Sequence, residues 1–134
     1  MSDFTTYTET RILDYFLNAN SLTTASPTTV YVALHTATPG EAGTASEASE
    51  TGYARASISF GAASTDTAGA TTISNDGAVS IGPITGTPTY THISIKDAST
   101  SGNTLFYGAL SSPITLTSGD SVQFGVGNVT VTLD

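Results

Sequence analysis

The chain contains no cysteine and no tryptophan, and few of its 134 residues carry a charge. Without cysteine the protein cannot form disulfides, use a thiolate nucleophile, or hold zinc or an iron–sulfur cluster through thiolates. Only 10% of the residues are charged, well below the proportion of about one quarter that is usual in globular proteins. The surface is therefore expected to be polar but mostly uncharged.

Basic residues are the scarcest class. Arg11, Arg55 and Lys96 stand against 11 acidic residues, which gives a formal net charge of −8. Binding to nucleic acids or to anionic membranes requires clustered basic side chains, so we expect neither partner. No apolar run approaches the length of a membrane span, and the acidic, polar start of the chain is not typical of a secretory signal.

Threonine, serine, alanine and glycine dominate instead, and many threonines occur in alternating runs that favour half-exposed strands. We predict a single mainly β domain over residues 1–134, with about eight short antiparallel strands in residues 28–134 and a helical segment at about residues 7–19. The spacing of turn signals favours a sandwich of the jelly-roll kind, and a partly open barrel remains the alternative.

The helix is predicted from its start signal and its apolar stripe. Thr6 and Glu9 have the spacing of a capping box. The apolar side chains that follow lie on one helical face: Ile12, Leu13, Phe16 and Leu17. We expect this face to be buried, either against the protein's own sheet or against a neighbouring subunit.

The strands are predicted from period-two patterns. After Pro27, Val30, Val32 and Leu34 should face the core, and Tyr31, Ala33 and His35 the polar side. In residues 91–97, alternation likewise places Thr91, Ile93 and Ile95 on one face and His92, Ser94 and Lys96 on the polar one. A second strand is expected at residues 53–60. Residues 61–70 are expected to form a polar loop, and residues 111–113, which include Pro113, to end the strand over 104–110.

Residues 37–52, "ATPGEAGTASEASETG", form an acidic loop between the first two strands. Tyrosines add large contact area at low entropic cost, and loop tips on a rigid sheet often touch partners. We therefore predict a protein-contact patch at the loop and beside it, made of Glu41, Glu47, Glu50, Tyr53, Arg55 and Tyr31. Ordinary strand packing is the alternative for the tyrosines. The three glutamates could chelate a hard cation, but the loop lacks the spacing of a calcium loop, and no metal ligand is predicted.

Candidate catalytic residues are sparse. His35 or His92 with Ser94 or Asp97 could form a nucleophile–base–acid set, but no local signature accompanies them. We expect the histidines to be solvated or hydrogen-bonded at the surface, and we predict no catalytic residue and no cofactor.

Lys96 could form an isopeptide cross-link to an Asn or Asp, as in some strand-rich adhesins and capsid shells. Residues 125–130, "GVGNVT", lack the following helix of a phosphate loop and are predicted to be a turn.

Several segments in order resemble a known group of proteins: "VYVALHTATPGEAG", "ETGYARASISF", "HISIKDASTSGNTLFYGAL" and "SGDSVQFGVGNVTVTLD". Together they are similar to small virion proteins of tailed bacteriophages, described as tail fibre, minor tail or head structural proteins. The resemblance covers about residues 8–134. It implies a β-rich, non-enzymatic structural protein of the virion, and it implies no catalytic residues.

Within the virion, we expect a capsid decoration or cement protein on the exterior of the head. Its partners would be other virion proteins, with the major capsid protein favoured, and the chain could form a homotrimer. The alternative is a tail fibre, tail tip or baseplate module that contacts the host. A small hydrolase using His35 or His92 is a third, more distant hypothesis.

Overall fold

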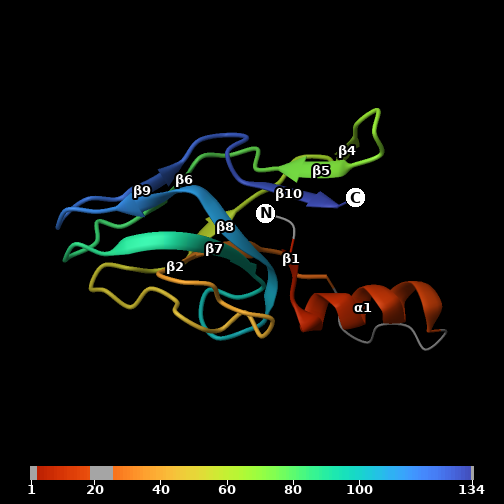
Figure 1. The fold of residues 1–134 in the computed structure, drawn as a ribbon, viewed down its shortest axis with the longest axis horizontal. Helices are drawn as coiled ribbons and strands as arrows, with labels where there is room; N and C mark the ends of the chain where they lie inside the picture. The colour runs from red at the N-terminus through yellow and green to blue at the C-terminus, as the bar shows by residue number, and fades with distance from the viewer. Residues whose placement is uncertain (1–2, 19–25, 134) are drawn as a thin grey trace.

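The computed structural model describes residues 3–18 and 26–133. Its strands form three antiparallel sheets, with one helix beside them (Figure 1). The largest sheet has the order β1-β8-β7-β2-β3, with β1 at Asp3–Phe4, β8 at Thr104–Thr115, β7 at Thr89–Lys96, β2 at Val30–His35 and β3 at Ala56–Ile58. The helix α1 spans Thr6–Leu17. The mainly β architecture with one N-terminal helix confirms the prediction, and its arrangement is sandwich-like.

Two smaller sheets complete the described fold. The first has the order β10-β5-β4, with β10 at Thr130–Leu133, β5 at Thr71–Ser74 and β4 at Ser64–Thr65. The second pairs β6, at Val79–Ile81, with β9, at Val122–Phe124. The sheet of β4, β5 and β10 lies at the same end of the molecule as α1, above it in the view of Figure 1.

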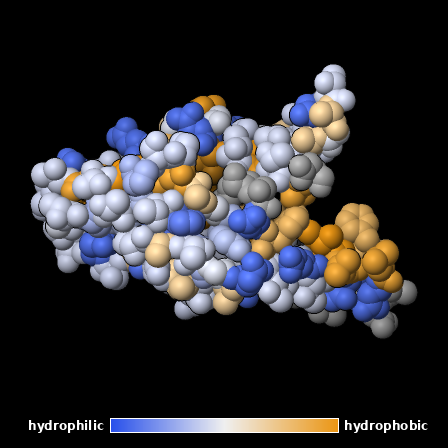
Figure 2. Space-filling view, viewed as in Figure 1, coloured by the Kyte–Doolittle hydropathy of each residue, from blue (hydrophilic) through white to orange (hydrophobic). Residues whose placement is uncertain are grey.

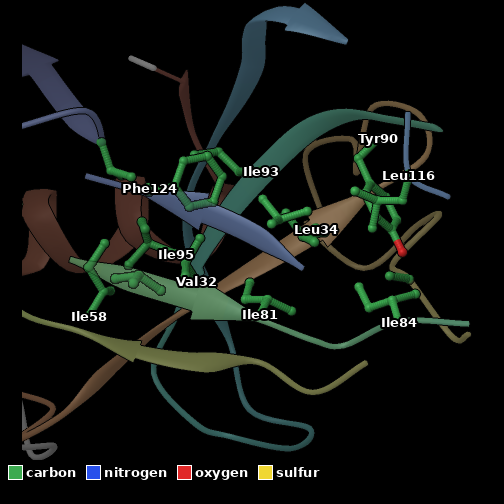
Figure 3. Close-up of a cluster of buried hydrophobic side chains, with 14 residues drawn as sticks. Val32, Leu34, Ile58, Ile81, Ile84, Tyr90, Ile93, Ile95, Leu116 and Phe124 are labelled. Carbon is green, nitrogen blue, oxygen red and sulfur yellow. The ribbon is translucent and has the colours of Figure 1, made fainter. Parts of the chain in front are cut away.

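The hydrophobic core lies between the large sheet and the β6–β9 pair (Figure 3). Val32 and Leu34 from β2 meet Ile93 and Ile95 from β7, as period-two alternation requires. Ile58 from β3 lies beside them in the same sheet, and side chains from β6, β9 and the connecting loops lie across the core: Ile81, Phe124, Ile84 and Leu116. The predicted inward-facing residues of β2 and β7 are thus confirmed.

The opposite face of β2 and β7 is also covered, which the alternation pattern does not predict. Ala33, His35, Ser94 and Lys96 are all at most 2% exposed. The connection from β2 to β3, which contains the acidic loop, runs along this face (Figure 1). The large sheet is therefore a middle layer, and the face that carries its polar side chains is buried as well.

Helix α1 differs from the prediction at its start and in its burial. The N-cap is Thr5 rather than Thr6, and its side chain accepts a hydrogen bond from the Thr8 backbone N–H. Thr5 is the better cap because its hydroxyl also donates to the Thr104 carbonyl, which ties the helix start to β8. The apolar stripe, by contrast, is exposed: Ile12, Leu13, Phe16 and Leu17 are not covered by the described residues of this chain.

Three strand boundaries also differ from the prediction. The second strand begins at Ala56, so Tyr53 and Arg55 precede it. Residues 61–70 contain the short strand β4, which pairs with β5. Strand β8 continues through Pro113, because the register against β7 jumps between the Tyr90–Ile114 and His92–Ala109 pairs. Pro113 lies in that irregularity, where the ladder makes no use of a backbone N–H.

Candidate functional site

The polar groups of the acidic loop converge on the covered face of the large sheet. Glu47 is the centre: its carboxylate accepts hydrogen bonds from the Tyr53 hydroxyl at 2.9 Å and from Arg55 Nε at 2.7 Å and Nη2 at 2.8 Å. Lys96 Nζ lies 3.4 Å from the same carboxylate. We call Glu47, Tyr53, Arg55 and Lys96 the Glu47 cluster. The cluster places the cationic side chains of Arg55 and Lys96 against the Glu47 carboxylate, on the side of the loop that faces the sheet.

Backbone carbonyls satisfy the remaining donors of the cluster. Lys96 Nζ donates to the Gly43 carbonyl at 3.0 Å and to Thr104 Oγ1 at 2.8 Å. Arg55 donates through Nη1 to the carbonyls of Ala98 at 2.9 Å and Ser101 at 2.7 Å. The cluster therefore links the acidic loop to β7, to β8 and to the loop that joins those two strands.

The geometry near Gly43 explains why a glycine stands there. Its φ of +68° is in the left-handed region, which is strained for residues with a side chain. A Cβ at this position would collide with the side chain of Thr104. The loop backbone thus approaches the sheet closely enough for its carbonyl to reach the buried lysine.

The other two glutamates of the loop bond to tyrosines as well. Glu41 accepts a hydrogen bond from the Tyr107 hydroxyl of β8 at 2.8 Å, and Glu50 accepts one from the Tyr90 hydroxyl of β7 at 2.9 Å. With the Glu47–Tyr53 bond, each glutamate of the acidic loop has one tyrosine donor. Charge-assisted hydrogen bonds of this kind are stronger than neutral ones, so the loop is held at three points.

Burial and these contacts shift the ionisation of the cluster. Burial disfavours a charged Glu47, but hydrogen bonds from Arg55 and Tyr53 and the charge of Lys96 outweigh it and lower its pKa to about 2. The Glu47 hydrogen bond raises the pKa of Arg55, and burial lowers the pKa of Lys96. The Glu41 hydrogen bond raises the pKa of Tyr107 to about 12. At neutral pH the arrangement is a charged network with neutral tyrosines.

His35 and Ser94 form a second, deeper contact on the same face. His35 Nδ1 donates to the Ala45 carbonyl at 2.8 Å, since a carbonyl can only accept. Its Nε2 therefore accepts the hydroxyl proton of Ser94 at 2.8 Å. The expectation of surface histidines is wrong for His35, which is fully buried, and burial lowers its pKa. His35 and Ser94 are thus in contact, but both side chains are sealed from solvent.

The remaining candidates do not join this pair. Asp97 accepts hydrogen bonds from the backbone and side chain of Asn103 instead. Lys96 contacts Glu47, Gly43 and Thr104 rather than an Asn or Asp side chain, so the cross-link geometry is not present. In the part of the chain that the structure describes, no three His, Cys, Asp or Glu side chains gather as metal ligands. The three loop glutamates point to three different tyrosines.

The structure brings together only part of the predicted contact patch. Glu47, Tyr53 and Arg55 form one cluster, whereas Glu41 and Glu50 lie at separate anchor points. Tyr31 is half-buried on β2, opposite Lys96 in the strand register. Whether these residues touch a partner stays a prediction.

Sequence reasoning missed the structural importance of Lys96 and Asn75. Asn75 is buried, donates to the carbonyls of Gly77 and Gly125, and accepts from the Val129 N–H. The residues "NDG" at 75–77 are a turn signal, which does not indicate this role. The predicted turn at residues 125–130 is confirmed, with Gly127 at a φ of +80°.

Comparison with known proteins places the chain among phage proteins. Residues 3–132 match the family described as "Podophage GP4 fiber I protein gp80". A search of the curated proteins finds no match. Within the described residues, no helix is long and apolar enough to cross a membrane. Because the match spans nearly the whole chain, this protein belongs to the podophage GP4 fiber I protein gp80 family, a family of tailed-phage virion structural proteins, as its sequence motifs predicted.

Proposed function

We propose that this protein is a fibre-type structural component of a tailed-phage virion that takes part in contact with the host. The observation that carries the proposal is the family match over residues 3–132. It supports the fibre alternative of the sequence analysis better than the expected capsid decoration. A non-enzymatic role fits the sealed His35–Ser94 pair, because a buried serine cannot meet a substrate.

Copy number and location on the particle test this proposal. Quantitative mass spectrometry of purified virions should find the chain at a small fraction of the major capsid protein, and antibodies against it should label the tail in electron micrographs. Particles that lack the protein should keep filled heads but adsorb poorly to host cells. A ratio close to that of the major capsid protein, with labelling of the head, would instead establish decoration.

Within this role, we propose that the acidic loop presents the contact surface and that the Glu47 cluster holds its shape. The support is the division of residues along the loop. Glu47 is anchored beneath it, whereas Glu41, Ala42 and Thr44 are exposed to solvent. Loops on rigid scaffolds are common binding elements, and a loop held at three points loses little entropy on binding.

A bulky substitution at the exposed loop tests this proposal separately. Thr44→Arg should reduce adsorption without changing the free energy of unfolding, because the added side chain reaches solvent in the free protein. The matched control is Gln123→Arg, which adds the same side chain at an exposed position of β9. Equal adsorption by the two variants would show that the loop is not the contact surface.

A further inference from the structure

The apolar face of α1 has no cover from the described residues of this chain. Five large apolar side chains on α1 are between 37% and 80% exposed: Ile12, Leu13, Tyr15, Phe16 and Leu17. With roughly 200 Å² for each full side chain, they present roughly 600 Å² of accessible surface. That is at the upper end of the apolar patches found on ordinary monomers, which reach about 300–600 Å².

The helix is nevertheless firmly placed. Thr5 and Thr8 donate hydrogen bonds to the Thr104 and Leu105 carbonyls of β8, the latter at 2.7 Å. Helix α1 packs on the rest of the described chain mainly through β8 and β1. A helix of this length is marginal in water without tertiary support, and here the described residues supply that support only at its N-terminal end.

An apolar groove lies close to this helix. It has a volume of about 330 Å³ and is lined by side chains from β2, β5, β7, β8 and β10 and from neighbouring loops. None of the described residues that line it is charged, and they include Phe60, Ile73, Ile95, Phe106, Val131 and Leu133. Figure 2 shows one open cleft, bordered by the apolar side chains of α1 on one side and by the end of the molecule that contains β4, β5 and β10 on the other.

From this geometry we infer that a second copy of the chain fills the cleft, with the apolar face of its α1 seated in the groove of the first. The chain itself supplies both complementary halves, a projecting apolar helix and an uncharged apolar groove. In a two-fold pair each helix enters the partner's groove, so every copy uses both surfaces.

Area and charge favour a second copy as the occupant. A standard interface buries about 800 Å² on each partner, and the exposed side chains of α1 supply roughly 600 Å² of accessible surface toward that area before the groove is added. Two copies that each carry a charge of −8 repel one another at long range, and a contact surface without charged side chains adds no further like-charge repulsion at close range. The cleft provides that surface, because charged side chains are absent from the described lining of the groove.

The oligomeric state of the full chain gives the first test. Analytical ultracentrifugation should show a dimer or a larger closed assembly. Phe16→Asp on the helix and Leu133→Asp in the groove should each weaken self-association by at least about tenfold, since each places a charge in the buried interface. Val126→Asp is the matched control, because Val126 is also apolar and 64% exposed but lies on the turn before β10. A wild-type monomer at all concentrations would overturn the inference.

Mixing the variants distinguishes helix-in-groove contact from other interfaces. A copy with Phe16→Asp keeps an intact groove, and a copy with Leu133→Asp keeps an intact helix. The mixture should therefore associate more tightly than either variant alone, through one intact contact. Absence of this complementation, with both single variants monomeric, would mean that the two surfaces do not meet.

Engineered disulfides identify the occupant directly, because the chain has no cysteine of its own. Leu17→Cys on the helix and Ala63→Cys in the groove, combined in one chain, should form a cross-link between two chains under mild oxidation. A cross-link within one chain, at monomer mass, would show that the helix covers its own groove and would overturn the inference. This result is independent of where the protein lies on the virion, so the inference and the fibre proposal can fail separately.

Discussion

At the residue scale, the free energy of this fold depends on a few buried polar groups. Glu47 balances two cations, and Lys96 is only 2% exposed although it carries a charge. A buried charge is costly unless it is paired and hydrogen-bonded, so each member of the Glu47 cluster depends on the others. Removing one partner should therefore cost more than losing its own hydrogen bonds.

Glu47→Gln tests this dependence. The amide can still accept hydrogen bonds, but Arg55 and Lys96 lose their counterion in a largely buried position. We expect the free energy of unfolding to fall by about 2–4 kcal/mol in chemical denaturation. The matched control is Glu41→Gln, which also bonds a tyrosine but is exposed, and should cost less than about 1 kcal/mol. Equal losses for the two variants would contradict the central position of Glu47.

The pH dependence of stability follows from His35 and Glu47. The pKa of folded His35 lies below its ordinary value of 6.5, so the unfolded chain takes up the proton first and stability falls as pH drops below about 6.5. Folded Glu47 has a pKa of about 2 against an ordinary 4.5, so further stability is lost between those values. Both effects act in the same direction, and the protein should be destabilised stepwise on acidification.

Denaturation curves between pH 7 and pH 3 measure this effect. His35→Gln removes the titrating ring, and it should flatten the dependence just below pH 6.5 while the later loss from Glu47 remains. An unchanged slope in that upper range would show that His35 does not take up a proton on unfolding.

At the element scale, side-chain hydrogen bonds add to a few backbone hydrogen bonds in holding the helix and the acidic loop to the large sheet. Thr5 caps α1 and bonds to β8, and three glutamate–tyrosine bonds hold the loop. These elements have few apolar contacts of their own. Their local stability should therefore depend on single hydroxyl groups.

Thr5→Ala should loosen α1 selectively. The variant loses the N-cap and leaves the buried Thr104 carbonyl without its hydroxyl donor, at a combined cost of about 1–3 kcal/mol. Hydrogen exchange in α1 should accelerate, while exchange in β2 and β7 changes less. Thr10→Ala is the control, because the Thr10 hydroxyl bonds to the Thr6 carbonyl on the exposed helix surface. Equal exchange in both variants would show that Thr5 does not anchor the helix.

At the scale of the whole molecule, net charge and apolar surface act against each other. The charge of −8 keeps copies apart, while the helix face and the groove draw them together. Long-range repulsion is screened by salt, whereas apolar contact is not weakened by it. The balance between free chains and assemblies should therefore depend on ionic strength.

Raising the salt concentration from about 0.05 M to about 0.5 M shortens the screening length and should strengthen self-association. Sedimentation velocity at a fixed protein concentration would follow the change. Phe16→Asp should stay less associated than the wild type at every salt concentration. Weaker association at high salt would indicate that ion pairs, rather than the apolar cleft, hold the copies together.

The sequence by itself determined the class of fold, the inward-facing residues of β2 and β7, the existence of the helix and the family. These properties rest on local patterns: period-two alternation, helical spacing, turn residues and the order of motifs. The core residues Val32, Leu34, Ile93 and Ile95 are predicted because their spacing alone decides their face.

Only the tertiary structure decided that the other face of the sheet is buried, that Lys96 and His35 lie inside, and that three glutamates meet three tyrosines. It also decided that the apolar face of α1 is exposed rather than packed on its own sheet. The physical reason is that alternation shows which side chains share a face but not what covers that face. A long loop leaves no periodic trace of where it folds back, so its partners are known only from the folded chain.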